Sequence, residues 1–181
     1  MLPFVSPADM TTDRLLLRAP VSADADALFT HYTSDIAVAR YLPWRLHRSV
    51  EETAALIAQC AGASVAHRSH LLVIAERGKQ EMPLGLLNLA GEEHCVSVGF
   101  GLASHGQGNG YAKEVLRATI DWLLRQPAVR RVWAYCDSAN IASARVLARA
   151  GMIHEGTLRR YAVHPNISPD PRDCELYAKT H

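Results

Sequence analysis

Apolar residues along the 181-residue chain change their spacing several times, and each spacing predicts a different kind of element. In the first third of the chain, after one short apolar strand, the spacing is mostly that of amphipathic helices. Ser22 and Ser49 are residue types that cap helix N-termini, and Glu52 completes a capping box with Ser49. We therefore expect a strand at 14–18 and helices at 22–32, 35–41 and 49–61.

Shorter apolar runs separated by turn residues follow, and they predict an antiparallel meander. Beyond the meander, a longer amphipathic pattern predicts a helix that Pro127 ends, and Gly151 is placed to end a second helix as its C′ residue. The strands of the meander are expected at 71–75, 84–90 and 95–102. The later elements are expected as helices at 112–125 and 139–150 and as strands at 129–136, 152–158 and 174–178.

Strands and helices in this order predict a single α/β domain over residues 11–181. Its central sheet should be mixed but mostly antiparallel, because three strands form a meander while the later ones are separated by helices. The helices should flank the sheet on its faces. No repeat, linker or low-complexity segment interrupts the pattern.

Composition narrows the classes of protein that fit this pattern. The chain is 49% hydrophobic and 20% charged, with a net charge of +1, and this balance argues against a nucleic-acid-binding protein with a broad basic face. Cys60, Cys95, Cys136 and Cys174 are widely spaced, which indicates reduced thiols in a cytoplasmic protein. Met1–Val5 lacks the features of a signal peptide, and no apolar run approaches the roughly 20 residues of a membrane span.

The nine histidines raise the question of a metal site. No pair of them has a convincing ligand spacing, and His67 and His70, an i,i+3 pair, come nearest. We therefore expect no metal, no membrane and no nucleic acid among the partners of this chain.

The most informative stretch is His105-Gly106-Gln107-Gly108-Asn109-Gly110-Tyr111-Ala112. Its three glycines stand between the expected strand at 95–102 and the expected helix at 112–125. A glycine-rich loop that opens a helix presents bare backbone N–H groups at the positive end of the helix dipole. The sequence therefore predicts a phosphate-binding loop.

Two common classes of phosphate-binding protein with a glycine-rich loop do not fit this sequence. A P-loop needs Gly-Lys-Ser/Thr at its end, whereas Gly110 is followed here by Tyr111-Ala112. A Rossmann site needs its glycines after the first strand of a βαβ unit, whereas this loop follows an antiparallel meander past mid-chain. An enzyme acting on nucleotide phosphates is therefore the weaker reading of the loop.

The chain resembles the GCN5-related N-acetyltransferase (GNAT) superfamily. The family's loop, Gln/Arg-x-x-Gly-x-Gly/Ala, is met by Gln107, Gly110 and Ala112, and its later Asn-x-x-Ser element is met by Asn140 and Ser143. Further matching segments are 98–102, 113–116 and 150–156, where Met152 replaces the usual Phe. The segments 12–18 and 173–177 resemble the two ends of the ribosomal-protein N-acetyltransferase (RimJ/RimL) branch.

The resemblance implies acetyl-coenzyme A as the co-substrate. It implies that backbone N–H groups hold the pyrophosphate, with the two later glycines allowing close approach. It also implies a bulge that splays the strand ending near Leu102, so that backbone groups on this strand pair with the pantetheine arm. The residues expected to contact the cofactor are Phe100, Gly101, Leu102, Gln107, Gly108, Asn109, Gly110, Tyr111, Ala112, Asn140 and Ser143.

Acetyl transfer from a thioester to an amine needs a neutral amine, a stabilised oxyanion and a proton for the departing thiolate. Related enzymes place a Ser or Tyr general acid where Ser143 stands, although a serine in a first helical turn can equally bond to the backbone. Asn140 matches a residue that contacts the cofactor and is also a natural N-cap. We expect the backbone N–H of Leu102 to donate to the oxyanion.

The general base is the open point. Many members of the superfamily carry a Glu on the bulged strand, at the position of Val96 here. Glu92 and His94 lie just upstream and share the face of Val96 by strand alternation, so either can act through a water. The alternatives are that they are solvated turn residues, or that water alone carries the proton of an amine with a low pKa.

The acceptor amine is expected to lie among the first helices and the loop before the last strand. Tyr41 and Trp44, with Arg45 and His47, are candidates for its groove, and Tyr161 is a candidate on the later loop. A protein N-terminus and a small amine both remain open as acceptors, and so does another acyl-CoA as donor. Another alternative is a catalytically silent CoA-binding sensor or interaction module. A homodimer is the commonest default among oligomers.

Overall fold

A computed structural model describes residues 9–63 and 69–181 of the chain. Two expectations from the sequence fall outside this description, namely the character of Met1–Val5 and any ligand role of His67. None of the helices within the described ranges is both long and apolar enough to cross a membrane.

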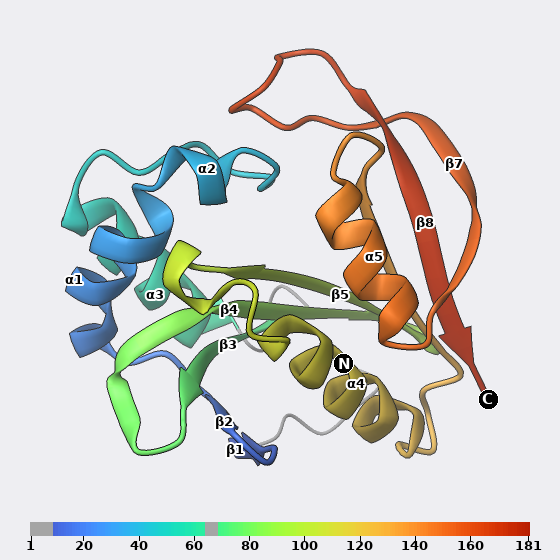
Figure 1. Cartoon of the computed structure of the whole chain (residues 1–181), viewed down its shortest axis with the longest axis horizontal. Helices are drawn as coiled ribbons and strands as arrows, with labels where there is room; N and C mark the ends of the chain where they lie inside the picture. Colours follow the sequence, from blue (N-terminus) through green and yellow to red (C-terminus); the bar gives the residue numbers. More distant parts are fainter. Residues whose placement is uncertain (1–8, 64–68) are drawn as a thin grey trace.

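Within the described residues, eight strands form one sheet in the order β1-β2-β3-β4-β5-β6-β8-β7 (Figure 1). All neighbouring strands are antiparallel except the pair β5 and β6, which is parallel. The sheet is therefore mixed and mostly antiparallel, as predicted. The strands are β1 (Asp9–Thr11), β2 (Leu15–Arg18), β3 (Ser69–Glu76), β4 (Lys79–Glu92), β5 (Cys95–Leu102), β6 (Arg131–Asp137), β7 (Ile153–Ala162) and β8 (Arg172–Thr180).

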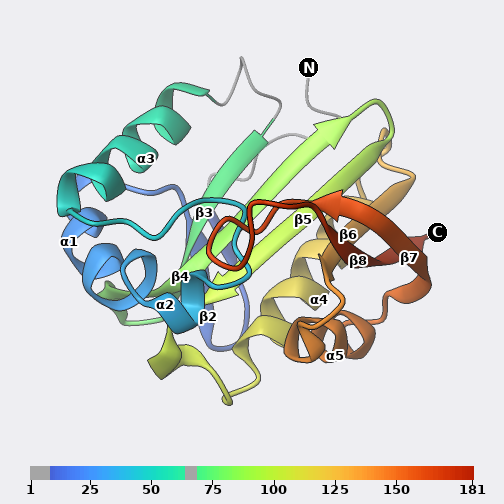
Figure 2. The same ribbon diagram turned by 90° about the horizontal axis from the view of Figure 1, so that it is seen from above.

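Helices cover both faces of the sheet, and side chains alternate along the strands between two cores (Figures 1 and 2). On β3, Leu72 and Ile74 belong to the larger core under α4, while Val73 belongs to the smaller core with Leu28 and Tyr32. The helices are α1 (Ala25–Leu28), α2 (Ile36–Ala39), α3 (Val50–Ala63), α4 (Tyr111–Leu124) and α5 (Ile141–Arg149).

The structure refines several predicted boundaries. The helix expected at 22–32 is a 3₁₀ turn (Ser22–Asp24), then α1, then a π-helical turn (Phe29–Thr33). The helix expected at 139–150 is shorter, because Asn140 caps it. Strand β1 was not predicted, and β4 and β7 are longer than expected, because pairing with a neighbour extends strands beyond their apolar runs.

Strands β5 and β6 pair along only three residues, Cys95 to Ser97 against Arg131 to Trp133. Beyond Ser97, β5 continues to Leu102 alongside β4 only, while β6 continues to Asp137 alongside β8. The predicted splay is therefore confirmed. Its cause differs from the expected bulge in β5, since the β4–β5 register is unbroken and the irregularity lies between β3 and β4, near Ala75.

Candidate functional site

The parallel pair sets the position of the candidate site. Strand β5 runs into the glycine loop and then α4, and β6 runs into Asn140 and then α5. Both helix N-termini therefore lie at the carboxyl end of the parallel pair, on either side of the divergence between the two strands (Figure 1). In α/β proteins, ligands often bind in a crevice at the carboxyl ends of two parallel strands, where the chain segments that follow the strands diverge.

The glycine loop has the conformation that the sequence predicts. Gly108 and Gly110 have φ of +79° and +78°, and Gly110 is the N-cap of α4. Among residues 9–63 and 69–181, no side chain caps this helix end, so its first N–H groups have neither an intrahelical nor a side-chain acceptor there. Residues 107–110 are exposed, which leaves these donors facing solvent. Such an arrangement of donors is suited to binding an anion.

A charged side chain from the start of the chain supports this loop. Arg14 donates to the carbonyl of Asn109 at 3.1 Å, pairs with Glu114 at 2.6 Å, and lies 4.5 Å over the Tyr111 ring. Burial raises the pKa of Glu114, but hydrogen bonds from Thr12 and Arg14 outweigh it and hold the pKa below its usual value. Sequence reasoning assigned no role to Arg14, because its partners lie about 100 residues further on.

Backbone alternation decides which groups of β5 face the crevice. Ala103 donates to the Leu84 carbonyl of β4, so Gly101 also directs its backbone groups to β4, while Phe100 and Leu102 direct theirs away from it. The backbone groups of Gly101 are therefore engaged with β4, and contact of this residue with the cofactor stays a prediction. A Cβ on Gly101 would also meet the hydroxyl of Tyr32 at 2.3 Å.

Gln107 bonds within the loop. Its side-chain amide donates to the Leu102 carbonyl at 2.9 Å, and its backbone N–H donates to Ser104 at 3.3 Å. The carbonyl of Leu102 is therefore occupied, and the donors left open to an anion begin after Gln107.

The Asn-x-x-Ser element forms the start of α5. The Asn140 side chain accepts from the backbone N–H of Ser143 at 3.1 Å and is the N-cap of the helix. The N-cap reading of Asn140 is therefore confirmed, while contact with a cofactor stays a prediction. The Ser143 hydroxyl is half-buried in the first turn, at the same edge of the sheet as Leu102.

Glu92 and His94 lie at the opposite edge. His94 stands in the hairpin turn that precedes β5, with its side chain 60% exposed. Eight residues of extended strand separate it from Leu102, which is about 26 Å. The structure brings Ser143 and Leu102 to one edge but does not bring Glu92 or His94 to it. The predicted face of Glu92 was wrong, because Glu92 ends β4 opposite Cys95 and therefore lies on the face of Cys95 and not on that of Val96. His94 lies in the turn, where strand alternation does not apply, and alternation carries no information on the distance along the strand.

A groove of about 790 Å³ lies where the acceptor was expected. Trp44, Arg45 and His47 line it together with residues of α3 and Asn166 from the β7–β8 connection. The rings of Trp44 and His47 are 4.9 Å apart, and burial lowers the pKa of His47. Two candidates lie outside this groove: Tyr41 donates to the Ala139 carbonyl at 3.4 Å, and Tyr161 packs on Tyr135.

The β7–β8 connection reaches across the crevice to the segment after α2 (Figures 1 and 2). Asn166 makes this contact: its side chain donates to the carbonyls of Ala39 and Trp44 and accepts from the N–H of Leu46, at 2.7–2.9 Å. The connection therefore forms a strap, residues 163–171, that links the two halves of the divided sheet.

A buried charged cluster lies at the root of this strap. The Asp137 carboxylate ends β6, is fully buried, and accepts from Arg172 at 2.5 and 3.1 Å. Burial raises the pKa of Asp137, but the bonds from Arg172 and the Ala139 N–H outweigh burial and hold the pKa below its usual value. His164 lies 3.7 Å from the same carboxylate.

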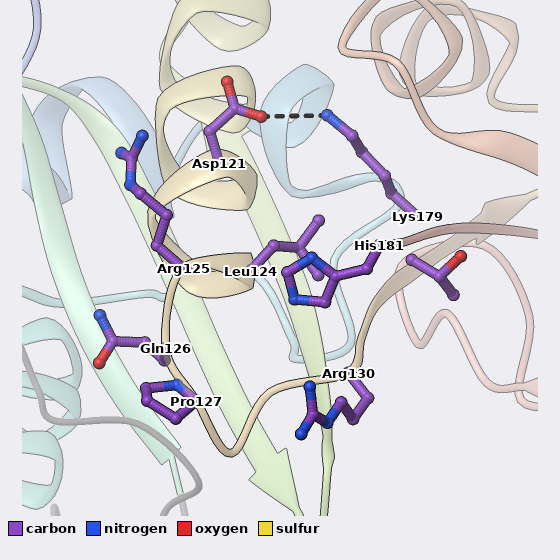
Figure 3. Close-up of a pocket in the computed structure, with 9 residues that line it drawn as sticks. Asp121, Leu124, Arg125, Gln126, Pro127, Arg130, Lys179 and His181 are labelled. Atoms are coloured by element: carbon purple, nitrogen blue, oxygen red, sulfur yellow. Dashed lines mark hydrogen bonds and ion pairs between the residues drawn. The ribbon is translucent and has the colours of Figure 1, made fainter.

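The described part of the chain holds no group of three or more His, Cys, Asp or Glu side chains arranged for a metal ion. A second hollow, of about 580 Å³, lies at the far end of α4 and contains the ion pair of Lys179 with Asp121 (Figure 3). Its first lining residue on α4, Asp121, lies about 15 Å along the helix from Tyr111, next to the glycine loop. It is not part of the crevice.

Comparison with known proteins agrees with this geometry. The chain is 28% identical over 171 residues to the uncharacterized N-acetyltransferase YoaA of Bacillus subtilis, covering 93% of this chain and 94% of that one. A GNAT-family acetyltransferase structure from Bacillus anthracis is 25% identical, with a TM-score of 0.81 and coverage of 95% and 98%. The ribosomal L7/L12 α-N-acetyltransferase RimL, solved with coenzyme A, shares the fold at 22% identity, with a TM-score of 0.79 and coverage of 94% and 96%.

The sequence profile of the acetyltransferase (GNAT) domain matches residues 14–153, which is most of the chain. This range contains the glycine loop, the splayed strand β5 and the N-terminus of α5. The chain therefore belongs to the GNAT family of acetyltransferases.

Proposed function

We propose that this enzyme transfers the acetyl group of acetyl-CoA to a primary amine, by direct attack of the amine in a ternary complex. The acceptor is a protein N-terminal α-amine or a small-molecule amine. The observation that carries the proposal is the uncapped N-terminus of α4 behind Gly108 and Gly110, at the open end of the crevice.

The donors of Gly108, Asn109, Gly110, Tyr111 and Ala112 bind the pyrophosphate of the cofactor. Their N–H groups lie at the positive end of the α4 dipole, and the two glycines leave room for phosphate oxygens. Arg14 holds the loop in place through the Asn109 carbonyl rather than binding phosphate itself, because Glu114 already neutralises its charge. RimL, which shares the fold, was solved with coenzyme A.

The amide-rich pantetheine arm lies along β5. The backbone groups of Phe100 and the N–H of Leu102 face the side that β6 has left, so the arm takes the place of a missing strand. The pantetheine arm therefore runs from the pyrophosphate at the glycine loop into the crevice. Asn140, while capping α5, borders the same path from the other side.

Ser143 and Leu102 carry the proposed chemistry at the thioester. The N–H of Leu102 donates to the oxyanion that forms when the amine attacks the carbonyl carbon. The Ser143 hydroxyl gives its proton to the sulfur as the carbon–sulfur bond breaks, and regains a proton from solvent. The groove lined by Trp44, Arg45 and His47 holds the acceptor, with Tyr41 and Tyr161 bordering the strap.

The variant Gly110→Trp tests the proposal. Its side chain fills the anion site, so we expect CoA binding measured by calorimetry to be lost. The matched control is Gly78→Trp, at φ +82° in an exposed turn with no atom near its Cβ position, which imposes the same backbone strain away from the loop. Equal CoA affinity of the two variants contradicts the loop assignment.

Turnover is measured as thiol release from acetyl-CoA with N-terminal peptides of ribosomal proteins, polyamines, amino acids and aminoglycosides. Amine-dependent release identifies the acceptor class. Tight CoA binding without release on any acceptor supports the silent binding module instead, and binding of ATP without CoA supports the nucleotide-phosphate alternative.

A further inference from the structure

The cluster at the root of the strap contains a histidine that the proposed chemistry does not use. His164 is 3% exposed, and its Nε2 lies 3.7 Å from Asp137 Oδ2 and 3.9 Å from the Cys174 sulfur. Proton-transferring imidazoles in many enzymes also have a buried carboxylate as neighbour, although here the 3.7 Å separation is that of an ion pair and not of a hydrogen bond. The position of this pair decides whether it can serve the reaction.

The position of the pair is the mouth of the crevice. Asp137 ends β6 four residues after Trp133, the last residue that pairs with β5. Tyr41 packs against the imidazole, with the two rings edge to face and 6.4 Å between their centroids. Two residues after His164, Asn166 reaches the wall of the acceptor groove. The imidazole therefore lies between the end of β6 and the groove.

The charged groups beside the ring are paired with each other. The guanidinium of Arg172 already neutralises Asp137 through two hydrogen bonds, so the cluster carries no uncompensated negative charge. When a proton arrives on the ring, the carboxylate stabilises the imidazolium at short range. The other titratable groups facing the ring are the Cys174 thiol of β8 and the Tyr41 hydroxyl.

One nitrogen of the ring lacks a partner. Throughout the part of the chain that the structure describes, no group hydrogen-bonds to His164 Nδ1, and it is the one buried side-chain polar atom in that state. Leaving a buried polar atom unpaired is unfavourable, and such atoms in native proteins are usually paired with water or a ligand. Nδ1 therefore marks a place for a water or a ligand group.

We infer that His164, oriented by Asp137, receives the proton of the acceptor amine through a water bound at Nδ1. The inference rests on the proposed acetyl transfer. The amine nitrogen bonds to the thioester carbon, its proton passes through the water to Nδ1, and the carbon–sulfur bond breaks as the sulfur takes a proton from Ser143. His164 then releases its proton to solvent, which restores the neutral ring and leaves an amide and a free thiol.

The test is the pH dependence of acceptor kcat/KM, measured by amine-dependent thiol release. The wild type should show an acidic limb in the histidine range. His164→Gln should lose this limb and fall about 100-fold or more at neutral pH, in the range that general bases contribute. Calorimetric CoA affinity should stay within about twofold, because the glycine loop is unchanged. His94→Gln, at the opposite edge of the sheet, is the comparison.

His164→Asn serves as the second variant if the first is poorly folded by thermal melting. The inference is overturned if the wild type shows no limb in the histidine range, if either folded variant keeps the limb and the rate, or if His94→Gln loses the limb instead. A wild type that binds CoA but releases no thiol with any amine refutes the transfer itself, and the inference with it. Failure of the proposed acetyl transfer is seen as a wild type without turnover. Failure of the His164 inference alone is seen with a wild type that turns over, so the two results are distinguishable.

Discussion

At the scale of single residues, the start of α5 separates two roles that its sequence motif combines. Asn140 caps the helix by accepting from the N–H of Ser143, so the serine hydroxyl is not needed for capping. In the described structure this hydroxyl makes no hydrogen bond of its own. It is therefore available to a ligand in the crevice, as a general acid must be.

Ser143→Ala should lower kcat about 100-fold while changing the Kd of CoA by less than about twofold. We expect kcat to change much more than Kd because the hydroxyl acts on the departing sulfur and does not contact the pyrophosphate. Steady-state kinetics with calorimetry measures both quantities. The control Ala142→Ser/Ser143→Ala restores a hydroxyl one residue earlier, about 100° around the helix, and should not recover activity. An unchanged kcat of Ser143→Ala would show that Ser143 is not the general acid.

Local features of the site could be predicted from the sequence, and long-range ones could not. The positive φ of Gly108 and Gly110 and the cap at Asn140 depend on neighbouring residues, so the motif predicts them. The contact of His164 with Asp137 depends on two elements that meet only in the folded sheet. The same limit explains His94, whose distance from the crevice strand alternation could not predict.

At the scale of elements, a π-helical turn packs directly under the splayed strand. The turn Phe29–Thr33 places Tyr32 in the smaller core, where burial raises the pKa of its hydroxyl. That hydroxyl occupies the space that a side chain at Gly101 would need. Helical periodicity predicted a continuous helix here, because one extra residue in a turn leaves no trace in an apolar pattern.

Gly101→Ala should therefore destabilise the protein by about 1–3 kcal/mol, since the new methyl group overpacks a fully buried ring. Tyr32→Phe in the same chain should recover part of the loss by removing the nearest atom, although ring carbons at 3.2 Å keep the fit tight. Urea denaturation of the two single variants and the double variant measures the coupling. Additive effects contradict the packing argument. The control is Gly99→Ala on the same strand, which meets no atom within 4 Å.

At the scale of the whole molecule, carboxylates tie together distant parts of the chain. Hydrogen bonds hold the pKa values of Glu114, Asp137 and Glu175 below their usual range. A depressed pKa means that the unfolded chain binds more protons as the pH falls. The stability that these groups contribute is therefore complete above the unfolded pKa, roughly 4, and is lost as the pH falls through the lower folded values.

Thermal melting across pH should show this loss, and Glu114→Gln isolates one contribution. At pH 7 the variant should melt below the wild type, because Gln cannot form the charged bonds to Arg14 and Thr12. The difference should begin to shrink below about pH 4, where Glu114 of the unfolded wild-type chain takes up a proton while the folded chain does so only at lower pH. A difference that stays constant down to pH 3 contradicts the assignment of the low pKa to Glu114.

The strand order has a consequence for how the chain folds during synthesis. Strand β8 lies between β6 and β7 in the sheet but follows both along the chain, so neither has its antiparallel neighbour until residues 172–180 have left the ribosome. Strands β1 to β5, by contrast, pair with sequence neighbours and can form while synthesis continues. A nascent chain stalled before β8 has two unpaired strand edges accessible to other chains. The nascent chain is therefore most prone to aggregation before β8 emerges.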